Sequence, residues 1–131
     1  MKNIKLLSAP NFYFVLTICW TCIIFYLCLA ESSSLPKFSI PLKDKIVHAI
    51  LYFMFIVLSY KSLHTKYRNS KSVAFIVLLS LIIGISIEIL QGAITVSRSF
   101  DLFDIVANFF GSLIGILLIS IKKYITQKRV V

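Results

Sequence analysis

The chain has 131 residues, of which 59% are hydrophobic and only 15% are charged, and its formal net charge is +9. Soluble domains are nearer half apolar and a quarter charged. Because the basic residues lie between long apolar runs, the composition excludes a nucleic-acid-binding globule, a disordered tail and a disulfide-stapled secreted module. This composition predicts a polytopic membrane protein with a single domain over residues 1–131.

Four apolar runs predict four transmembrane helices. A helix needs about 20 mainly apolar residues to cross the hydrocarbon core of a bilayer. None of the runs alternates polar and apolar residues with the period of two that a half-buried strand shows. We therefore expect an all-α fold, an integral membrane bundle whose spans lie near residues 10–30, 44–60, 72–92 and 102–122.

The first apolar run, Leu6–Ala30, also has the basic start of a signal peptide. Its length exceeds the 7–15 apolar residues usual for such a segment, so we expect a retained anchor; cleavage would leave three spans with the same orientation. Cys19 and Cys22 form a C-x-x-C motif inside this run. Without a second pair, the motif indicates small packing residues, and no disulfide framework is expected.

The basic residues predict the orientation of the chain. Cytoplasmic loops carry an excess of Lys and Arg, and ten of the fourteen basic residues lie at the N-terminus, in the loop after the second span and at the C-terminus. Both termini are therefore expected in the cytoplasm. All five acids then lie on the outer side: Glu31, Asp44, Glu88, Asp101 and Asp104.

Polar side chains gather near the outer ends of spans two, three and four. At about 100° per residue they follow one face of each helix. The stripes contain Asp44, Lys45, His48 and Tyr52; Ser80, Gly84, Glu88 and Gln91; and Asp101, Asp104, Asn108, Gly111 and Gly115. Ionisable residues at this depth are costly against lipid. We expect the stripes to face one another around a polar pocket that is open to the outside.

Several members of this set also fit purely structural roles. Asp101 and Asp104 have the spacing of an N-cap and an acid in the first helical turn, where negative charge is favourable. Asp44 and Lys45 fit the start of a helix.

The remaining members leave the choice open. Glu88 and Arg98 fit a structural ion pair, and a single histidine such as His48 is more typical of hydrogen-bonded packing than of catalysis. Glu88 nevertheless lies near a helix C-terminus, where cations and not acids are favourable.

The order and spacing of these residues resemble the VanZ-like family over roughly Lys43 to Leu118. The motifs are Asp44-Lys45-x-x-His48, Tyr52-Phe53, Glu88-x-x-Gln91, Arg98, Asp101-x-x-Asp104 and Asn108-x-x-Gly111. The resemblance implies a small multi-pass protein of the bacterial cytoplasmic membrane, and the namesake of the family is linked to resistance to the glycopeptide teicoplanin. The family has no agreed biochemical activity, so its name supplies no mechanism.

The first functional hypothesis is binding. Lys45 and Arg98 suit a phosphate or a carboxylate, and the acids and amides suit hydroxyls, amines or amides. The partners expected are the lipid bilayer and an envelope precursor, lipid headgroup or glycopeptide, with no nucleic acid. The candidate residues are Asp44, Lys45, His48, Tyr52, Glu88, Gln91, Arg98, Asp101, Asp104 and Asn108.

Two other hypotheses stay open. In an enzyme, His48 with Asp44 and Glu88 would supply general acid–base chemistry, or the acids with His48 would hold a divalent metal. The chain contains no G-x-S-x-G, H-E-x-x-H or P-loop motif, and the sequence identifies no resident metal or cofactor. In a transport assembly, a homo-oligomer would be needed to complete a path.

Overall fold

The structure, a computed structural model, describes residues 9–30 and 43–129. In these ranges the chain forms α1 (Ala9–Leu29), α2 (Lys43–Ser62), a 3₁₀ turn (Thr65–Tyr67), α3 (Ser70–Ile94) and α4 (Leu102–Lys128), and no strand. Each of the four long helices is apolar and long enough to cross a membrane. The predicted all-α bundle of four spans is confirmed.

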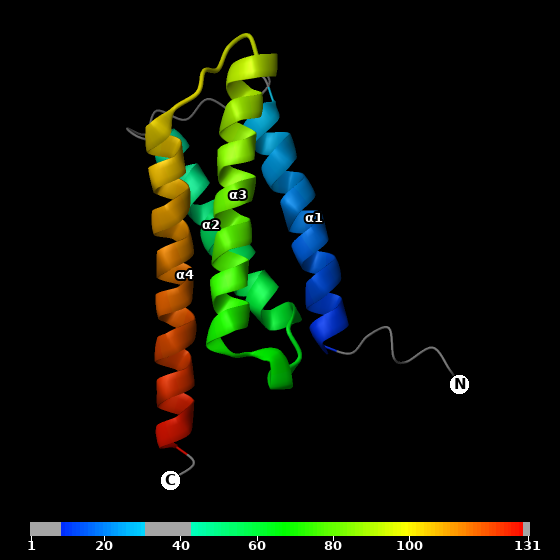
Figure 1. The fold of residues 1–131 in the computed structure, drawn as a ribbon, viewed down its shortest axis with the longest axis vertical. Coiled ribbons are helices and arrows are strands. Elements are labelled where there is room, and N and C mark those ends of the chain that lie inside the picture. The colour runs from blue at the N-terminus through cyan, green and yellow to red at the C-terminus, as the bar shows by residue number, and fades with distance from the viewer. Residues whose placement is uncertain (1–8, 31–42, 130–131) are drawn as a thin grey trace, which may run out of the picture.

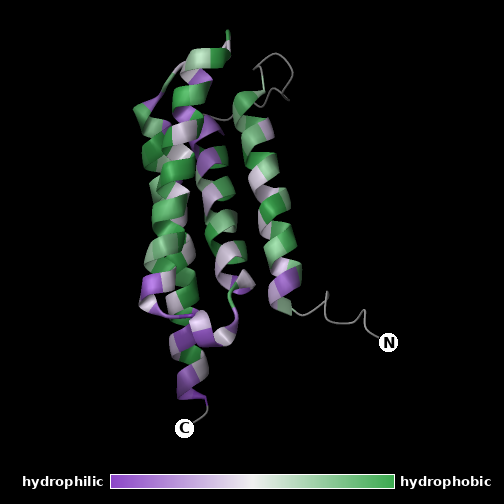
Figure 2. Cartoon of the chain, turned by 45° about the vertical axis from the view of Figure 1, so that its right-hand side comes forward, coloured by the Kyte–Doolittle hydropathy of each residue, from purple (hydrophilic) through white to green (hydrophobic). Residues whose placement is uncertain are grey.

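The four helices lie alongside one another, so the bundle has two ends (Figure 1). The loop end holds the last turns of α1 and α3 and the first turns of α2 and α4. The terminal end holds the start of α1 and the last turn of α4. Hydrophilic residues concentrate toward these ends, and apolar residues dominate the lengths between them (Figure 2).

Local sequence explains where two helices begin. The Asn69 side chain caps α3 by accepting the Ser72 N–H at 3.0 Å, and the Asp101 side chain caps α4 by accepting the Phe103 N–H at 2.8 Å. Such caps satisfy N–H groups that have no partner within the helix. The end of α4 lies six residues beyond the predicted span limit of 122, because the basic segment up to Lys128 continues the helix past the apolar run.

Glycines allow α2 and α4 to approach closely. A Cβ atom added at Gly111 would lie only 2.0 Å from the Ala49 carbonyl oxygen, and one at Gly115 would lie 3.1 Å from the Ile56 side chain. Small residues at helix interfaces permit such backbone contact in membrane proteins. The predicted glycine stripe of the fourth span is therefore the face by which α4 packs on α2.

Few polar bonds join the helices in the middle of the bundle. Trp20 Nε1 donates to the Leu51 carbonyl oxygen at 2.8 Å and links α1 to α2. The Ser80 and Ser112 hydroxyls lie 2.8 Å apart and link α3 to α4. These bonds satisfy polar groups in surroundings that offer them no water.

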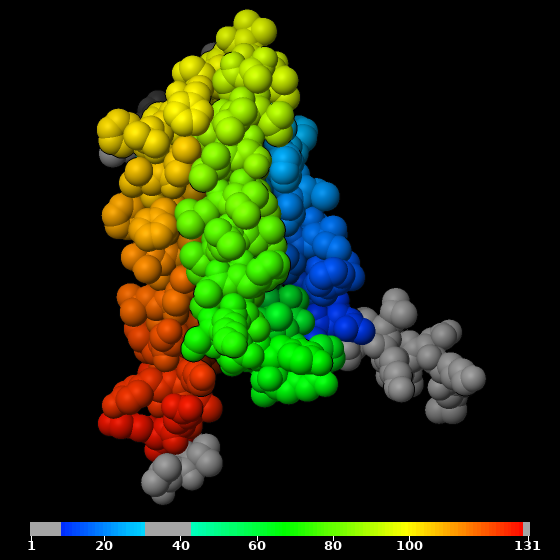
Figure 3. Space-filling view, viewed as in Figure 1, coloured from blue at the N-terminus to red at the C-terminus, as the bar shows by residue number. Residues whose placement is uncertain are grey.

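The outward surface of the bundle is apolar. In the space-filling view α3 runs between α4 and α1, and the α3–α4 connection crosses the loop end (Figure 3). Phe75 on α3 and Leu117 on α4 are about 60% exposed, at 63% and 59%. Lipid tails suit such a surface. Cys19 and Cys22 are exposed on α1, and all three cysteines are free.

Candidate functional site

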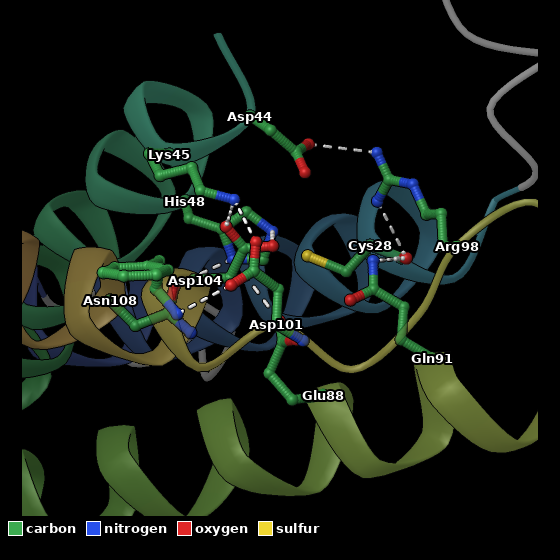
Figure 4. Close-up of polar contacts among 11 residues, drawn as sticks. Cys28, Asp44, Lys45, His48, Glu88, Gln91, Arg98, Asp101, Asp104 and Asn108 are labelled. Atoms are coloured by element: carbon green, nitrogen blue, oxygen red, sulfur yellow. Dashed lines mark hydrogen bonds and ion pairs between the residues drawn. The ribbon is translucent and has the colours of Figure 1, made fainter. Parts of the chain in front are cut away.

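The loop end contains a group of polar side chains that we call the polar cluster. It consists of Asp44, Lys45, His48, Tyr52, Glu88, Gln91, Arg98, Asp101, Asp104 and Asn108. The structure brings side chains from α2, α3, α4 and the α3–α4 connection together there (Figure 4). The inner members are at most 3% exposed. The others form a partly exposed rim, with side-chain exposures between 15% and 43%.

Lys45 is the centre of one half of the rim. Its ammonium pairs with the Asp101 carboxylate and lies 2.8 Å from Asp104 Oδ1. These ion pairs join the first turn of α2 to the start of α4. They hold the two helices together above the glycine contact.

Asp101 has a structural role and a place in the cluster at the same time. It caps α4 through the Phe103 N–H while it pairs with Lys45. The bond from the Lys45 ammonium, and then that from the Phe103 N–H, lower the pKa of the Asp101 carboxyl below its ordinary value. The predicted N-cap is confirmed, and it does not exclude a role in the cluster.

Arg98 is the centre of the other half of the rim. Its Nη2 donates to Asp44 Oδ1 at 3.2 Å, and its Nη1 donates to the Cys28 carbonyl oxygen at 3.1 Å. Gln91 Nε2 donates to the same carbonyl at 2.6 Å. Arg98 and Gln91 therefore attach α1 to the cluster.

The contribution of Cys28 is absent from the sequence-based site. The sequence predicted only a packing role for the cysteines, yet the backbone carbonyl of Cys28 accepts two hydrogen bonds from cluster residues. A general signal existed, because the last four carbonyls of any helix have no partner within it. That signal does not identify which of the four accepts.

Glu88 lies in the interior of the cluster and is fully buried. Its Oε2 accepts the Asp101 N–H at 3.2 Å, and its Oε1 lies 4.0 Å from His48 Nδ1. Oε1 has no hydrogen-bond partner. A buried carboxylate oxygen without a donor is costly, which marks this point as a place where a charge or a ligand is needed.

His48 links the inner groups. Its Nδ1 lies 3.0 Å from Asn108 Oδ1, and its Nε2 lies 3.8 Å from Asp104 Oδ2. An amide oxygen only accepts hydrogen bonds, so this assignment of the Asn108 amide places a proton on Nδ1. The other ring nitrogen, Nε2, faces the Asp104 carboxylate.

Tyr52 is an inner member of the cluster and lies beside Gly84 of α3. The residue is fully buried, and its hydroxyl has no hydrogen-bond partner. A Cβ atom added at Gly84 would lie 3.4 Å from this hydroxyl and 3.0 Å from Asn108 Nδ2. Gly84 therefore leaves room on α3 for both polar side chains.

The charges of the cluster do not balance. Asp44, Glu88, Asp101 and Asp104 face two cations, Lys45 and Arg98. Ligand atoms of Asp44, His48 and Asp104 all lie within 4.8 Å of one another, a grouping that suits a metal ion. The arrangement can attract a cation, hold a zwitterionic group or relay a proton through His48.

A separate hollow lies toward the terminal end, and we call it the apolar groove. It has a volume of about 650 Å³ between α1, α2 and α3, and its lining includes Phe14, Ile18, Phe55, Phe75 and Leu79. No residue of the polar cluster lines it. The bundle thus has a polar cluster at one end and an apolar hollow on one side.

Four helices able to span a membrane, with ionisable side chains buried at one end of the bundle, define a polytopic membrane protein. The sequence model of the VanZ/LLP1 family matches residues 12–123, and the chain belongs to this family. The match begins in α1, so it is wider than the region Lys43 to Leu118 that carries the motifs.

A curated relative comes from a yeast. The uncharacterized protein C11E3.10 of Schizosaccharomyces pombe is 32% identical over 83 residues, which cover 63% of this chain and 50% of that protein. The aligned region thus spans half the length of the relative. No solved structure matches the chain.

Proposed function

We propose that this VanZ/LLP1 protein binds the polar headgroup of a lipid or lipid-linked envelope precursor in the polar cluster. The observation that carries the proposal is the burial of Glu88, Asp104 and His48 at one end of the bundle. Buried ionisable groups in membrane helices generally mark a ligand or ion site. The rim supplies both charges that a zwitterionic headgroup needs.

The rim pairs provide the means of recognition. The Asp44 side chain is 43% exposed, so it can turn away from Arg98 and leave the guanidinium, which is 15% exposed, to an incoming anion. A phosphate would take the Arg98 guanidinium in bidentate fashion, and an amine would take the Asp44 carboxylate. Lys45 and Asp101 offer the same two charges on the other side.

We further propose that the loop end faces the outside of the bacterial cytoplasmic membrane. In the described part of the chain, basic residues without nearby acids gather at the terminal end: Lys61, Lys66, Arg68, Lys71, Lys122, Lys123, Lys128 and Arg129. Such residues favour the cytoplasmic side. Both termini then lie in the cytoplasm, as the sequence predicts.

Orientation can be tested by labelling single cysteines in intact cells, in a chain whose three native cysteines are replaced by alanine. Val96→Cys lies in the α3–α4 connection, and Tyr67→Cys lies in the α2–α3 turn. A membrane-impermeant maleimide should label the first site and spare the second. Labelling of Tyr67→Cys alone would show that the protein has the opposite orientation and would overturn this proposal.

The glycopeptide context comes from the family. A protein that occupies headgroups or lipid-linked precursors at the outer leaflet would change how teicoplanin, which carries a lipid tail, acts there. Deletion should therefore lower the teicoplanin tolerance of the source organism more than its vancomycin tolerance. Re-expression of the native chain should restore that tolerance.

Cluster variants make this experiment specific. Glu88→Gln, Arg98→Ala and Asp104→Asn should each fail to restore tolerance at normal abundance, whereas the outward-facing variant Leu117→Ile should restore it. Unchanged tolerance and unchanged envelope lipids on deletion would overturn the proposal.

One observation favours an enzyme as a second candidate. His48 lies between the carboxylates of Glu88 and Asp104, at 4.0 and 3.8 Å, which is the setting of a general base. In that case His48→Ala should abolish activity and leave headgroup binding intact. Restoration of tolerance by His48→Ala would eliminate the catalytic role.

A further inference from the structure

We propose that Asp44, His48 and Asp104 bind one divalent transition-metal ion, of the Zn²⁺ or Mn²⁺ type, in the polar cluster. The inference deepens the headgroup function above and rests on it for the purpose of the ion, which would bridge the cluster to a phosphate oxygen. Binding of the ion itself can be measured without any headgroup.

The first argument is the geometry of the donors. One atom each from Asp44, His48 and Asp104 lies within 4.8 Å of the other two. Bonds of about 2.0–2.2 Å from such donors to Zn²⁺ place two ligand atoms no more than about 4.4 Å apart. A small inward movement of the partly exposed Asp44 side chain therefore completes the set.

The second argument is that each donor keeps a free site. Asp104 gives Oδ1 to Lys45, and its Oδ2 faces His48 Nε2. Asp44 accepts from Arg98 through Oδ1, and a carboxylate has a second oxygen. His48 uses Nδ1 for Asn108, which leaves Nε2.

The third argument comes from the groups behind the histidine. A metal-bound imidazole usually donates its other N–H to a carbonyl or carboxylate oxygen. Asn108 Oδ1 accepts from Nδ1 at 3.0 Å, and Glu88 Oε1 lies 4.0 Å from the same atom (Figure 4). Glu88 Oε1 is buried without a hydrogen-bond partner. A metal ion bound to the imidazole would stabilise this carboxylate oxygen through the positive charge of the ion.

The fourth argument is charge. Four carboxylates against two cations leave the cluster net negative, in surroundings of low dielectric. A divalent ion neutralises that excess. Imidazole as one donor favours Zn²⁺, and the two carboxylates also suit Mn²⁺, whereas Mg²⁺ and Ca²⁺ prefer oxygen ligands throughout.

The test uses the full, untagged chain purified in detergent, stripped with a chelator and dialysed against Zn²⁺, Mn²⁺, Mg²⁺ or Ca²⁺. Elemental analysis should find about one Zn²⁺ or Mn²⁺ per chain and less Mg²⁺ or Ca²⁺. His48→Ala and Asp104→Asn should lose that ion, whereas His64→Ala, the matched histidine control in the α2–α3 connection, should keep it. A metal-free native chain, or equal binding by His48→Ala, would overturn the inference.

A second measurement does not depend on the folding of cluster variants. The chain has two histidines, so in His64→Ala the remaining imidazole is that of His48. Pulsed electron paramagnetic resonance of bound Mn²⁺ in this chain should show coupling to an imidazole nitrogen, and its absence would refute ligation by His48. A pair of Asn108 variants tests the group behind the histidine. Asn108→Leu should weaken binding of the metal ion by about 10–100-fold, whereas Asn108→Asp, which keeps an acceptor for His48 Nδ1–H, should bind the ion about as well as the native chain.

The outcomes separate the two proposals. If no metal binds but the cluster variants still fail to restore teicoplanin tolerance, the metal inference fails and the headgroup function stands. If the metal binds at His48 and the variants restore tolerance fully, the headgroup function fails and the metal site stands.

Discussion

The two ends of the bundle differ in the groups that their charged side chains contact. At the loop end, Lys45 and Arg98 pair with carboxylates from other elements. At the terminal end, in the described part of the chain, four cations lie over tyrosine rings and not against acids: Lys61, Lys66, Arg68 and Lys128. The first arrangement joins helices through buried groups, and the second leaves charge at the surface.

This contrast divides the net charge of +9 into two functions. In the described part of the chain the terminal end carries eight basic residues and no acid, whereas the loop end carries three basic and four acidic residues, a net charge of −1. Basic groups such as those at the terminal end orient a chain and attract anionic lipid. The loop end contains both signs and nearly all of the buried ionisable groups described. We therefore place the function in the smaller set of acidic and basic residues at the loop end, which the total net charge does not reveal.

The largest effect should come from Gly111→Leu, which separates the helices that carry the cluster. Its Cβ atom would overlap the Ala49 carbonyl oxygen at 2.0 Å, and backbone cannot yield as a flexible side chain can. Extra methylenes in a packed core cost roughly 1–3 kcal/mol, and a leucine side chain forced against the backbone costs more than that, so we expect the bundle to lose its packing. Size-exclusion chromatography in detergent should show loss of monodisperse protein. The outward-facing Ile114→Ala is the control, and an unchanged profile for Gly111→Leu would contradict the packing described.

The next effect compares single charges at the two ends. Asp104→Ala removes the buried carboxylate that pairs with Lys45 and leaves the partly exposed Asp101, so we expect about 3 kcal/mol, the low end of the cost of breaking a buried pair. Lys66→Ala removes only a contact with the Tyr67 ring and should change stability by no more than about 0.5 kcal/mol. Thermal unfolding in detergent measures both. Equal shifts in the two variants would remove the distinction between the ends.

A smaller effect is expected for Arg98→Ala, which releases α1 from the rim. The guanidinium bonds to the Cys28 carbonyl and to Asp44 contribute roughly 1–3 kcal/mol together. Hydrogen exchange should rise in the last turn of α1 and in the α3–α4 connection. The terminal end should be unaffected, and a uniform rise along the chain would show that the bond has no local role.

The smallest effect is the pH dependence of the Asp101 contribution. Because pairing with Lys45 lowers its folded-state pKa below the ordinary 3.8, the stabilisation is complete well above that value and is lost as the pH falls below it. Asn also caps helices well, so Asp101→Asn removes the charge and keeps the cap. The native chain should melt above this variant at pH 7, and the difference should shrink as the pH falls below 3.8. A constant difference would contradict the assignment.

The sequence predicts the helices well because hydropathy along one run is a local property. The first span was predicted near 10–30 and α1 is Ala9–Leu29. The end of α4 differs because leaving the bilayer does not end a helix: the segment after Ile121 contains neither Gly nor Pro and places Lys128 in the last turn, where cations are favourable.

Helical phase also predicts which side chains face inward. Ser80, Gly84, Glu88 and Gln91 are all buried on α3, as their spacing indicates. Phase cannot give the partner of Arg98, because this residue lies in a connection without helical periodicity. Its acceptor on α1 is the backbone carbonyl of Cys28. Every residue has such a carbonyl, so the residue type at this position does not reveal the contact.

The central claim is that the polar cluster, and not the apolar groove, holds the ligand of this protein. Mass spectrometry of lipids that co-purify with the native chain, with Glu88→Gln and with the groove variant Leu79→Ala tests it directly. We expect one class of lipid or precursor to be retained by the native chain and Leu79→Ala and lost from Glu88→Gln. Loss from Leu79→Ala with full retention by Glu88→Gln would contradict the claim.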